Sequence, residues 1–438
     1  MEQYFGLSKL GTNVKTEVRA GLATFLTMAY IIVVNPLILA DAGMPVEGVV
    51  FATVAVSALS SILMGFAANL PFALAPGMGI NAFFTYNIVI GLDVTWETAL
   101  GAVFISGIVF LILSAFKVRE LIVRAIPRTL RYAVASGIGL FLAFIGLQWA
   151  GFIVADPATL VSFGGLSVEV VLFAVGLFAT SWLVIRRVPG ALILGIVGTS
   201  VLAVIVSLIL QAGGEESIVT IPETVFAMPS LEVFGSLDIA GALTAGMILP
   251  IFTLLFTDMF DSISTFVGVS EVGGFVEKDT GQPRNVGKAL FVDAVSTTIS
   301  GLFGTSSGTT YIESAAGVEE GGRTGLTAVV AGLLFLPFLF LSPLIQFVPQ
   351  VAVAPVIVLV GVFMVRPVLS IEWTNFEESV PAFLALILIP LTYNITQGIV
   401  WGFLSYTIIK VLLGKGREVS LTLWIVDVLA IAVLIYGA

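Results

Sequence analysis

The sequence contains no cysteine and no histidine, and only 11% of its 438 residues are charged. Without cysteine the chain can form no disulfide and offers no thiolate for a metal or for nucleophilic catalysis. Without histidine it lacks the side chain whose pKa lies closest to neutrality, so any proton transfer would rest mainly on carboxyl groups. Because soluble domains carry about 25% charged residues, this composition excludes an ordinary soluble protein.

Apolar residues take the place of charge and make up 58% of the chain. Stretches of about 20 apolar residues, each long enough to cross roughly 30 Å of hydrocarbon, recur from end to end. They predict an all-α polytopic membrane protein with seven spans in each half and a polar segment at 211–238 between the halves. A last apolar stretch at 420–437 contains Asp427 and either spans the membrane or lies along its interface. The predicted spans are 21–40, 48–68, 75–92, 98–116, 130–150, 168–186, 190–211, 241–270, 286–303, 309–318, 324–345, 351–366, 379–393 and 397–413.

The basic residues indicate how these spans are oriented. If the N-terminus is cytoplasmic and the spans alternate, all 18 lysines and arginines fall on the cytoplasmic side, where such residues are normally enriched. The outer loops instead carry acids such as Asp41, Glu47 and Asp93. The polar N-terminal segment lacks a cleavable signal. We therefore expect a multi-pass protein of the plasma membrane with a cytoplasmic N-terminus, in contact with the lipid bilayer and with no nucleic-acid partner.

The third span of each half is interrupted, at 75–86 (APGMGINAFFTY) and at 304–317 (GTSSGTTYIESAAG). An odd number of spans per half makes the second half inverted relative to the first. Interrupted spans at corresponding positions of two inverted halves indicate a binding site near the middle of the membrane. Irregular backbone is tolerated at that depth only where protein or a water-filled cavity satisfies it. The architecture therefore predicts a carrier.

The first interruption has the residue types that a ligand site at a broken helix needs. Pro76 lacks an N–H and disfavours helix at the preceding residue, which predicts an extended entry before a short helix. Glycines such as Gly79 let a flat ligand approach the backbone, and Asn81 adds a donor and an acceptor. The structural alternative is a kink that lets helices pack closely.

Three acidic side chains within predicted spans point to binding and proton transfer. Asp258 and Asp261 lie three residues apart and share one face of the eighth span. Glu313 follows the hydroxyl-rich part of the second interruption. Carboxyl groups deep in a membrane are costly and are usually functional, and a proton-coupled carrier requires groups of this kind. An ion pair between Glu313 and Arg323 is the structural alternative.

Other polar and aromatic residues have a structural interpretation beside the functional one. Asp293, near the predicted cytoplasmic end of its span, is expected to pair with Arg284 or Lys288. In the apolar first span, which also contains Asn35, Thr27 and Tyr30 either line the cavity or pack between helices. Phe83 and Phe260 could stack on a planar ligand, although any one of the 33 phenylalanines is by default lipid-facing or core. No nucleotide-hydrolysing motif is present, so transport is not expected to be driven by ATP within this chain.

Three stretches resemble the adenine/guanine/hypoxanthine permeases, the AzgA-like branch of the nucleobase–cation symporter or nucleobase–ascorbate transporter superfamily. They are NLPFALAPGMGINAFFTY, FTDMFDSISTFVG and GTSSGTTYIESAAGVEEGGRTGL, and the similarity runs over essentially the whole chain. The resemblance implies a uracil-permease-like fold of two inverted seven-helix repeats, with short β-strands in spans 3 and 10. It also implies a core domain made of 1–128 (spans 1–4) and 241–348 (spans 8–11). The gate domain would comprise 129–211 (spans 5–7) and 349–438 (spans 12–14 and the C-terminal apolar stretch).

The resemblance further implies import of adenine, guanine or hypoxanthine with a proton, as the core moves against the gate and without a cofactor or metal. Sodium is the alternative coupling ion, and both a monomer and a homodimer fit. Thr265 stands where uracil-type relatives have a histidine, which favours the purine branch. The candidate substrate-binding residues are Asp261, Glu313, Gly79, Asn81, Thr27, Phe83, Phe260, Thr310 and Ser314. The candidates for proton coupling are Asp261, Glu313 and Asp258.

Two other classes of transport protein compete with this interpretation. A xanthine/uracil or anion carrier would share the inverted repeat, but an anion carrier is expected to place basic or neutral side chains where Asp261 and Glu313 stand. An ion channel would more often show pore rings from oligomer symmetry than paired broken helices. An enzyme is not expected, because without histidine or cysteine no nucleophile–base pair of the usual kind is available.

Overall fold

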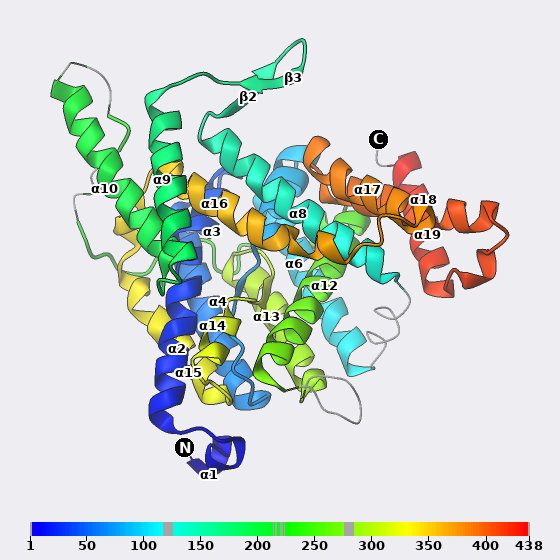
Figure 1. Cartoon of the computed structure of the whole chain (residues 1–438), viewed down its shortest axis with the longest axis horizontal. Helices are drawn as coiled ribbons and strands as arrows, with labels where there is room; N and C mark the ends of the chain where they lie inside the picture. The colour runs from blue at the N-terminus through cyan, green and yellow to red at the C-terminus, as the bar shows by residue number, and fades with distance from the viewer. Residues whose placement is uncertain are drawn as a thin grey trace.

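The computed structural model describes residues 2–116, 126–212, 214, 217–219, 222, 224–275 and 284–436. Most of these residues are helical (Figure 1). Within the described ranges, ten helices are long and apolar enough to cross a membrane, and Met78–Ile90 and Gly325–Phe340 are shorter apolar helices. The protein is therefore a helical, multi-pass membrane protein, as predicted. Of the basic residues used to orient the spans, Lys117, Arg119, Arg124 and Lys278 lie outside the described part of the chain.

The first half of the chain runs to the end of α10. Its elements are α1 (Glu2–Phe5), η1 (Ser8–Leu10), α2 (Val14–Met28), α3 (Ile31–Ala40), α4 (Val46–Ala67), β1 (Leu74–Pro76), α5 (Met78–Ala82), η2 (Phe83–Ile90), α6 (Trp96–Ala115), α8 (Arg128–Trp149), β2 (Ile153–Asp156), β3 (Leu160–Phe163), α9 (Val168–Ile185) and α10 (Ala191–Ala212). β2 and β3 form an antiparallel hairpin between α8 and α9. The first predicted span consists of two helices, α2 and α3.

The second half has a similar order of elements. They are α11 (Ile239–Ala242), η3 (Ala245–Met247), α12 (Ile248–Gly273), α13 (Val286–Phe303), β4 (Gly308–Thr310), α14 (Ser314–Glu319), α15 (Gly325–Phe335), η4 (Leu336–Phe340), η5 (Ser342–Phe347), α16 (Gln350–Val365), η6 (Arg366–Ser370), α17 (Phe376–Leu391), α18 (Ile395–Leu412), η7 (Gly416–Glu418) and α19 (Leu421–Tyr436). The apolar stretch at 420–437 thus contains a helix, α19. Since α17 and α19 each have 16 residues, the count of fourteen spans stays a prediction.

Several long helices begin at a side chain that caps them. Asn13, Thr95, Ser167, Asn375 and Asn394 each precede a helix and accept a hydrogen bond from a backbone N–H of its first turn. Short polar side chains are favoured at this position because they satisfy N–H groups that the helix leaves unpaired. The sequence therefore specifies these starts locally, without help from tertiary packing.

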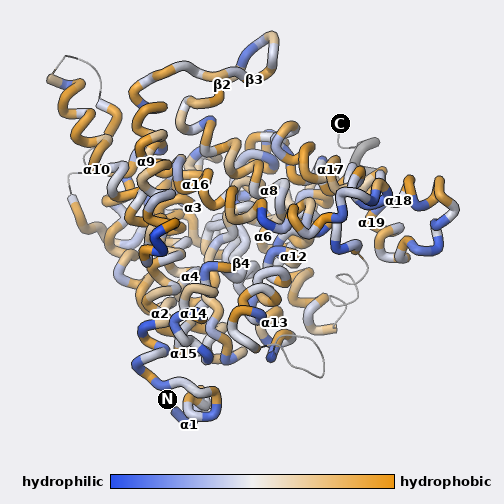
Figure 2. The backbone as a smooth tube through the Cα atoms, viewed as in Figure 1, coloured by the Kyte–Doolittle hydropathy of each residue, from blue (hydrophilic) through white to orange (hydrophobic). Residues whose placement is uncertain are grey.

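The helices pack as two groups. The core group contains α2 to α6 and α12 to α15, in which α4 packs on α15 and α6 packs on α13. The gate group contains α8 to α10 and α16 to α18, in which α8 packs on α16 and α17. In Figure 1 the gate helices form a band from α9 and α10 on the left to α17 and α18 on the right. Figure 2 shows α9 and α10 as hydrophobic along most of their length, and many of their apolar side chains are exposed.

Glycines let the paired core helices approach closely. A Cβ atom added to Gly107 of α6 would lie 2.7 Å from the Cα atom of Thr298 in α13. A Cβ added to Gly301 of α13 would lie 2.7 Å from the backbone nitrogen of Phe104 in α6. Small residues at helix contacts allow backbones to approach this closely in membranes, where dispersion contacts between helices drive their association.

Each interrupted span begins with a short strand, and the two strands pair at the centre of the fold. β1 and β4 are antiparallel, with Leu74 opposite Thr310 and Pro76 opposite Gly308. The backbone N–H of Gly77 donates to the Ser307 carbonyl at 2.9 Å. The pair therefore satisfies extended backbone at a depth where it would otherwise lack partners. Figure 2 places β4 in the interior, among the core helices.

The helix after β1 departs from the expected form. Met78–Ala82 is α-helical, but Phe83–Ile90 is a π-helix. A π-helix is rare and occurs mostly as a single turn, frequently at functional sites. The sequence did not predict it, because no residue type marks the change of hydrogen-bond spacing.

Candidate functional site

The strand pair brings two threonine hydroxyls to different acidic side chains. Thr309 Oγ1 lies 3.4 Å from Asp261 Oδ2, and Thr310 Oγ1 lies 3.2 Å from Asp293 Oδ1. Adjacent residues of a strand point to opposite sides, so β4 connects an acid of α12 on one side with an acid of α13 on the other. The strand therefore organises the carboxyl groups around the middle of the fold.

Glu313 lies between β4 and α14 and bonds to the first predicted span. The Tyr30 hydroxyl donates to Glu313 Oε1 at 2.7 Å, and Thr27 Oγ1 lies 3.4 Å from the Glu313 carbonyl oxygen. Arg323 instead donates to the carbonyl oxygens of Val318 and Gly322. The alternative of a Glu313–Arg323 ion pair is therefore wrong in this structure.

The two aspartates of α12 have different surroundings. Asp258 is fully buried and accepts a hydrogen bond from Thr297 of α13. Asp261 is partly exposed, as is Glu313. Asp261 also lies close enough to Asp293 and Glu313 for their charges to interact. One helix face thus presents one acid to the packed helices and a second acid to more open space.

The expected ion pair of Asp293 is wrong, because this side chain is buried in the core group. It has no exposed surface, and Thr310 donates to it. Arg284 donates instead to the carbonyl oxygens of Asn69 and Arg323. Proximity in sequence suggested a pair at the membrane surface, whereas the turn of α13 directs Asp293 toward β4.

The polar residues of the first interruption lie in a buried network. Asn81 Nδ2 donates to Asn35 Oδ1 at 3.2 Å, and Asn35 Nδ2 donates to Thr53 and Thr305. Asn81 Oδ1 is buried without a partner among the described residues. The Asn81 amide is therefore oriented by the hydrogen bond of its nitrogen, and its oxygen remains available as an acceptor.

The other candidate residues contact the protein in distinct ways. Gly79 faces Ile138 of α8, and a Cβ added there would lie 2.5 Å from Ile138 Cγ2. Ser314 Oγ accepts from the backbone N–H of Ala73 at 3.0 Å. Phe83 is buried. The Phe260 ring lies 5.9 Å from the Arg131 guanidinium of α8. Gly79 and Phe260 therefore lie where the core group meets the gate group, and Ser314 supports β1.

Sequence reasoning missed Asp293 and Tyr311 as neighbours of this site. The Tyr311 hydroxyl donates to the Pro76 carbonyl at 2.5 Å, which ties the second interruption to the first. Tyr311 stands beside Thr310 in the segment already singled out, so its position was a usable signal. Asn35 stands out as a polar residue in an apolar span, but no local pattern predicts its partners Thr53 and Thr305.

The arrangement can bind a small polar molecule from several sides. It combines two partly exposed carboxyl groups, hydroxyl donors and a free amide acceptor with aromatic rings nearby. Carboxylate oxygens accept hydrogen bonds from N–H groups of a ligand. Among the described residues, no group of three or more acidic side chains could hold a metal ion.

A multi-pass membrane chain with two interrupted spans that pair at its centre is typical of a transport protein. The chain belongs to the Permease family, whose model matches residues 15–401. It is 46% identical to "Putative permease MJ0326" of Methanocaldococcus jannaschii, over 98% of this chain and 96% of that protein. It is 42% identical to "Adenine permease AdeP" of Escherichia coli, over 100% of this chain and 96% of that protein. It is 40% identical to "Guanine/hypoxanthine permease PbuO" of Bacillus subtilis, over 95% of this chain and 96% of that protein.

Solved structures with low sequence identity share the fold. The transmembrane domain of the cyanobacterial bicarbonate transporter BicA has a TM-score of 0.65 at 16% identity, covering 89% of this chain and 97% of that one. SLC26A9 has a TM-score of 0.62 at 11% identity, covering 90% of this chain and 65% of that one. The chain is thus a permease with a transporter fold and not an enzyme.

Proposed function

We propose that this permease imports purine nucleobases, namely adenine, guanine and hypoxanthine, together with a proton. The observation that carries the proposal is the pair of partly exposed carboxyl groups, Asp261 and Glu313, beside the β1–β4 strand pair. A purine presents ring and exocyclic N–H donors that match carboxylate acceptors. Relatives whose names state adenine or guanine/hypoxanthine transport cover nearly the whole chain, which supports the purine class.

In the proposed complex, each candidate residue has a role that its surroundings support. Asp261 and Glu313 accept N–H groups of the base, and the free oxygen of Asn81 accepts another. Phe83 and Phe260 pack against the ring, while Gly79 and Thr27 shape the cavity wall. Thr310 and Ser314 act through Asp293 and β1, to which they are hydrogen-bonded.

We propose that the proton is carried by the acidic group formed by Asp261, Glu313 and Asp258. The charges of Asp261 and Glu313 interact, and Asp258 lies three residues before Asp261 on the same helix face. Charged carboxyl groups are costly in a medium of low dielectric constant, so a proton held by this group would reduce that cost. Binding of a base that bonds to one protonation state would link substrate movement to proton movement. Sodium is the alternative coupling ion that the experiment below tests.

Two inverted seven-span repeats explain the packing of the helices. In this arrangement α4 of the first repeat corresponds to α13 of the second, and α6 corresponds to α15. The α4–α15 contact therefore has the α6–α13 contact as its equivalent, and both pairs pack extensively. The inverted repeat also exchanges the α9–α16 pair with the α17–α8 pair, which are both in contact. This symmetry supports a core domain of 1–128 and 241–348 that moves against a gate domain of 129–211 and 349–438.

The orientation can be tested with single cysteines, because the natural chain has none. Ala158→Cys, in the β2–β3 hairpin, is expected to react with a membrane-impermeant maleimide in intact cells, since this hairpin is predicted to be extracellular. Lys15→Cys, which is also exposed, is expected to react only after the plasma membrane is permeabilised. Reversed labelling of the two positions would contradict a cytoplasmic N-terminus.

Anion transport is the strongest rival, because murine SLC26A9, whose structure resembles this one, is an anion transporter. The likeness to SLC26A9 extends to the fold alone at 11% identity. Two acidic side chains beside the strand pair would repel an anion. Bicarbonate is therefore expected to compete poorly for the site when added in excess to the uptake experiment. Excess uracil, which is neutral, tests the xanthine/uracil alternative separately, and strong competition by uracil would favour that alternative.

Uptake of labelled adenine and hypoxanthine, in a host that lacks its own purine importers, is expected to be saturable. A protonophore should reduce the initial rate at least about tenfold if the proton gradient supplies the driving force. Replacement of sodium by choline should leave the rate unchanged. Absence of purine uptake by protein that reaches the membrane would overturn the substrate class, and uptake that persists with the protonophore would overturn proton coupling.

A further inference from the structure

The carboxylate of Asp41 joins the core group to two different gate helices. Asp41 ends α3 and lies in the exposed part of the chain. Trp149 Nε1, at the end of α8, donates to Asp41 Oδ2 at 3.2 Å, and Gln350 Nε2, at the start of α16, donates to Asp41 Oδ1 at 3.2 Å. One side chain of the core group thus holds the ends of two gate helices.

Tyr86 adds a second connection at the same place. Its hydroxyl donates to Asp41 Oδ2 at 2.6 Å and lies 3.1 Å from Trp149 Nε1. Its ring meets the edge of Tyr393, in the connection between α17 and α18, with ring centroids 5.3 Å apart. Tyr86 therefore contacts the gate group through both its polar and its aromatic parts.

Asn87 grips the backbone of the same α17–α18 connection. Its side-chain nitrogen donates to the Tyr393 carbonyl, and its oxygen accepts from the Ile395 backbone N–H at 3.2 Å. Tyr393 has a positive φ of 55°, an uncommon conformation for a bulky residue. The amide of Asn87 bonds to the carbonyl of this residue and to the backbone N–H two residues later, and so holds the connection in that conformation.

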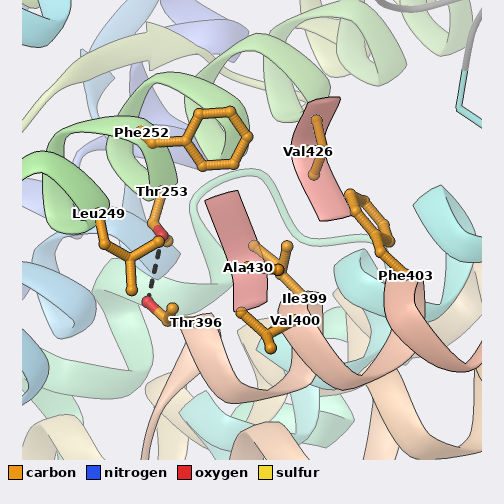
Figure 3. A pocket seen from close by; sticks show the side chains of 9 residues that line it. All are labelled: Leu249, Phe252, Thr253, Thr396, Ile399, Val400, Phe403, Val426 and Ala430. Atoms are coloured by element: carbon orange, nitrogen blue, oxygen red, sulfur yellow. Dashed lines mark hydrogen bonds between the residues drawn. The ribbon is translucent and has the colours of Figure 1, made fainter. Parts of the chain in front are cut away.

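These contacts lie on one side of the membrane. They occur at the ends of α3 and α8, within η2, and at the starts of α16 and α18, which the alternation of spans places on the same side. A further bond between the groups, Thr253 to Thr396 at 3.1 Å, joins the starts of α12 and α18 (Figure 3). In the proposed orientation this side is extracellular.

We propose that Asp41, Tyr86 and Asn87 of the core group, with Trp149, Gln350 and Tyr393 of the gate group, form an outer latch. The outer latch holds the extracellular side closed and must open before the site can face outward. None of its six residues is a candidate substrate residue, so it sets the balance between inward-facing and outward-facing states. The assignment of its side to the exterior rests on the proposed function and orientation.

The test uses Ile145→Cys as a reporter in the cysteine-free chain. Ile145 is fully buried and lies one turn before Trp149 on the same face of α8, so it is reachable from outside only when the outer latch is open. Trp149→Phe combined with Gln350→Ala is expected to speed its reaction with an impermeant thiol reagent about tenfold in intact cells. An unchanged rate would overturn the proposal.

Two controls separate opening of the outer latch from unfolding. Tyr393→Phe keeps the ring and the backbone carbonyl through which Tyr393 joins the outer latch. It removes only a hydroxyl bonded to Gln148 within the gate group, so the reporter rate should stay unchanged. A rise equal to that of the double variant would overturn the proposal. Ser57→Cys, a buried position in α4, should stay unreactive. If Ser57→Cys does react in the double variant, the test is repeated with Gln350→Ala alone. This milder variant is expected to raise the labelling rate of Ile145→Cys at least twofold.

The outcome does not depend on the identity of the substrate. Faster labelling without purine uptake would leave the outer latch standing and overturn the proposed substrate. Purine uptake with unchanged labelling would support the proposed substrate and overturn the outer latch. Labelling from the cytoplasmic side only would show that the contacts close the inner side, and would overturn the proposal as stated.

Discussion

Glu313→Gln and Asp261→Asn, made separately, are each expected to lower the initial rate of purine uptake at low substrate concentration about 100-fold. An amide replaces a carboxylate oxygen by an NH₂ donor, which then faces an N–H donor of the base. Sites built to hydrogen-bond a ligand discriminate strongly when a buried partner is left unpaired. The measurement is uptake of labelled adenine and hypoxanthine, together with equilibrium binding to purified protein.

Glu320→Gln is the matched control for these variants. Glu320 lies on the exposed surface after α14 and pairs with Arg19. Because exposed ion pairs contribute little, the uptake rate of the Glu320→Gln variant should stay within about twofold of that of the unchanged protein. Equal losses in Glu320→Gln and Glu313→Gln would point to a general defect. Normal uptake by both site variants would remove Asp261 and Glu313 from the proposed site.

Gly107→Val is expected to destabilise the protein by about 3 kcal/mol or more. Overpacking of a tight core typically costs about 1–3 kcal/mol, and more where the neighbour cannot move. The neighbour here is the backbone of α13, 2.6 Å from the added Cβ at the Thr298 nitrogen. Either α6 and α13 separate, or both helices bend. Thermal unfolding of the purified protein in detergent, followed by loss of its monodisperse peak, measures the effect.

Gly198→Val provides the matched comparison, because Gly198 also lies inside a long helix, α10, and has open space around it. The same substitution should therefore leave the unfolding temperature nearly unchanged. If Gly107→Val and Gly198→Val unfold at the same temperature, the close approach of α6 and α13 does not limit stability. Activity is not needed for this measurement, so it is independent of the substrate assignment.

The fold was more predictable from sequence than the site. Apolar stretches and cap residues such as Asn13 and Thr95 specify where helices lie, because both signals are local. The pairing of Glu313 with Tyr30 joins residues 283 apart in sequence, and no local pattern encodes it. Asp293 shows the limit most plainly, since its nearest charged neighbours along the chain are not its partners in space.

The pairing of β1 with β4 has a consequence for how this chain is made. Ala73 and Gly77 bond to Ser314, Tyr311 and Ser307, and Tyr311 is synthesised 235 residues after Pro76. Until then, these backbone groups lie at membrane depth without those partners, at a cost of several kcal/mol each in hydrocarbon. The third span therefore has to be held against water or the insertion machinery while the second half is translated. The strand pair at the centre of the protein can form only once β4 has been made, although its first strand ends at Pro76, much earlier in the chain.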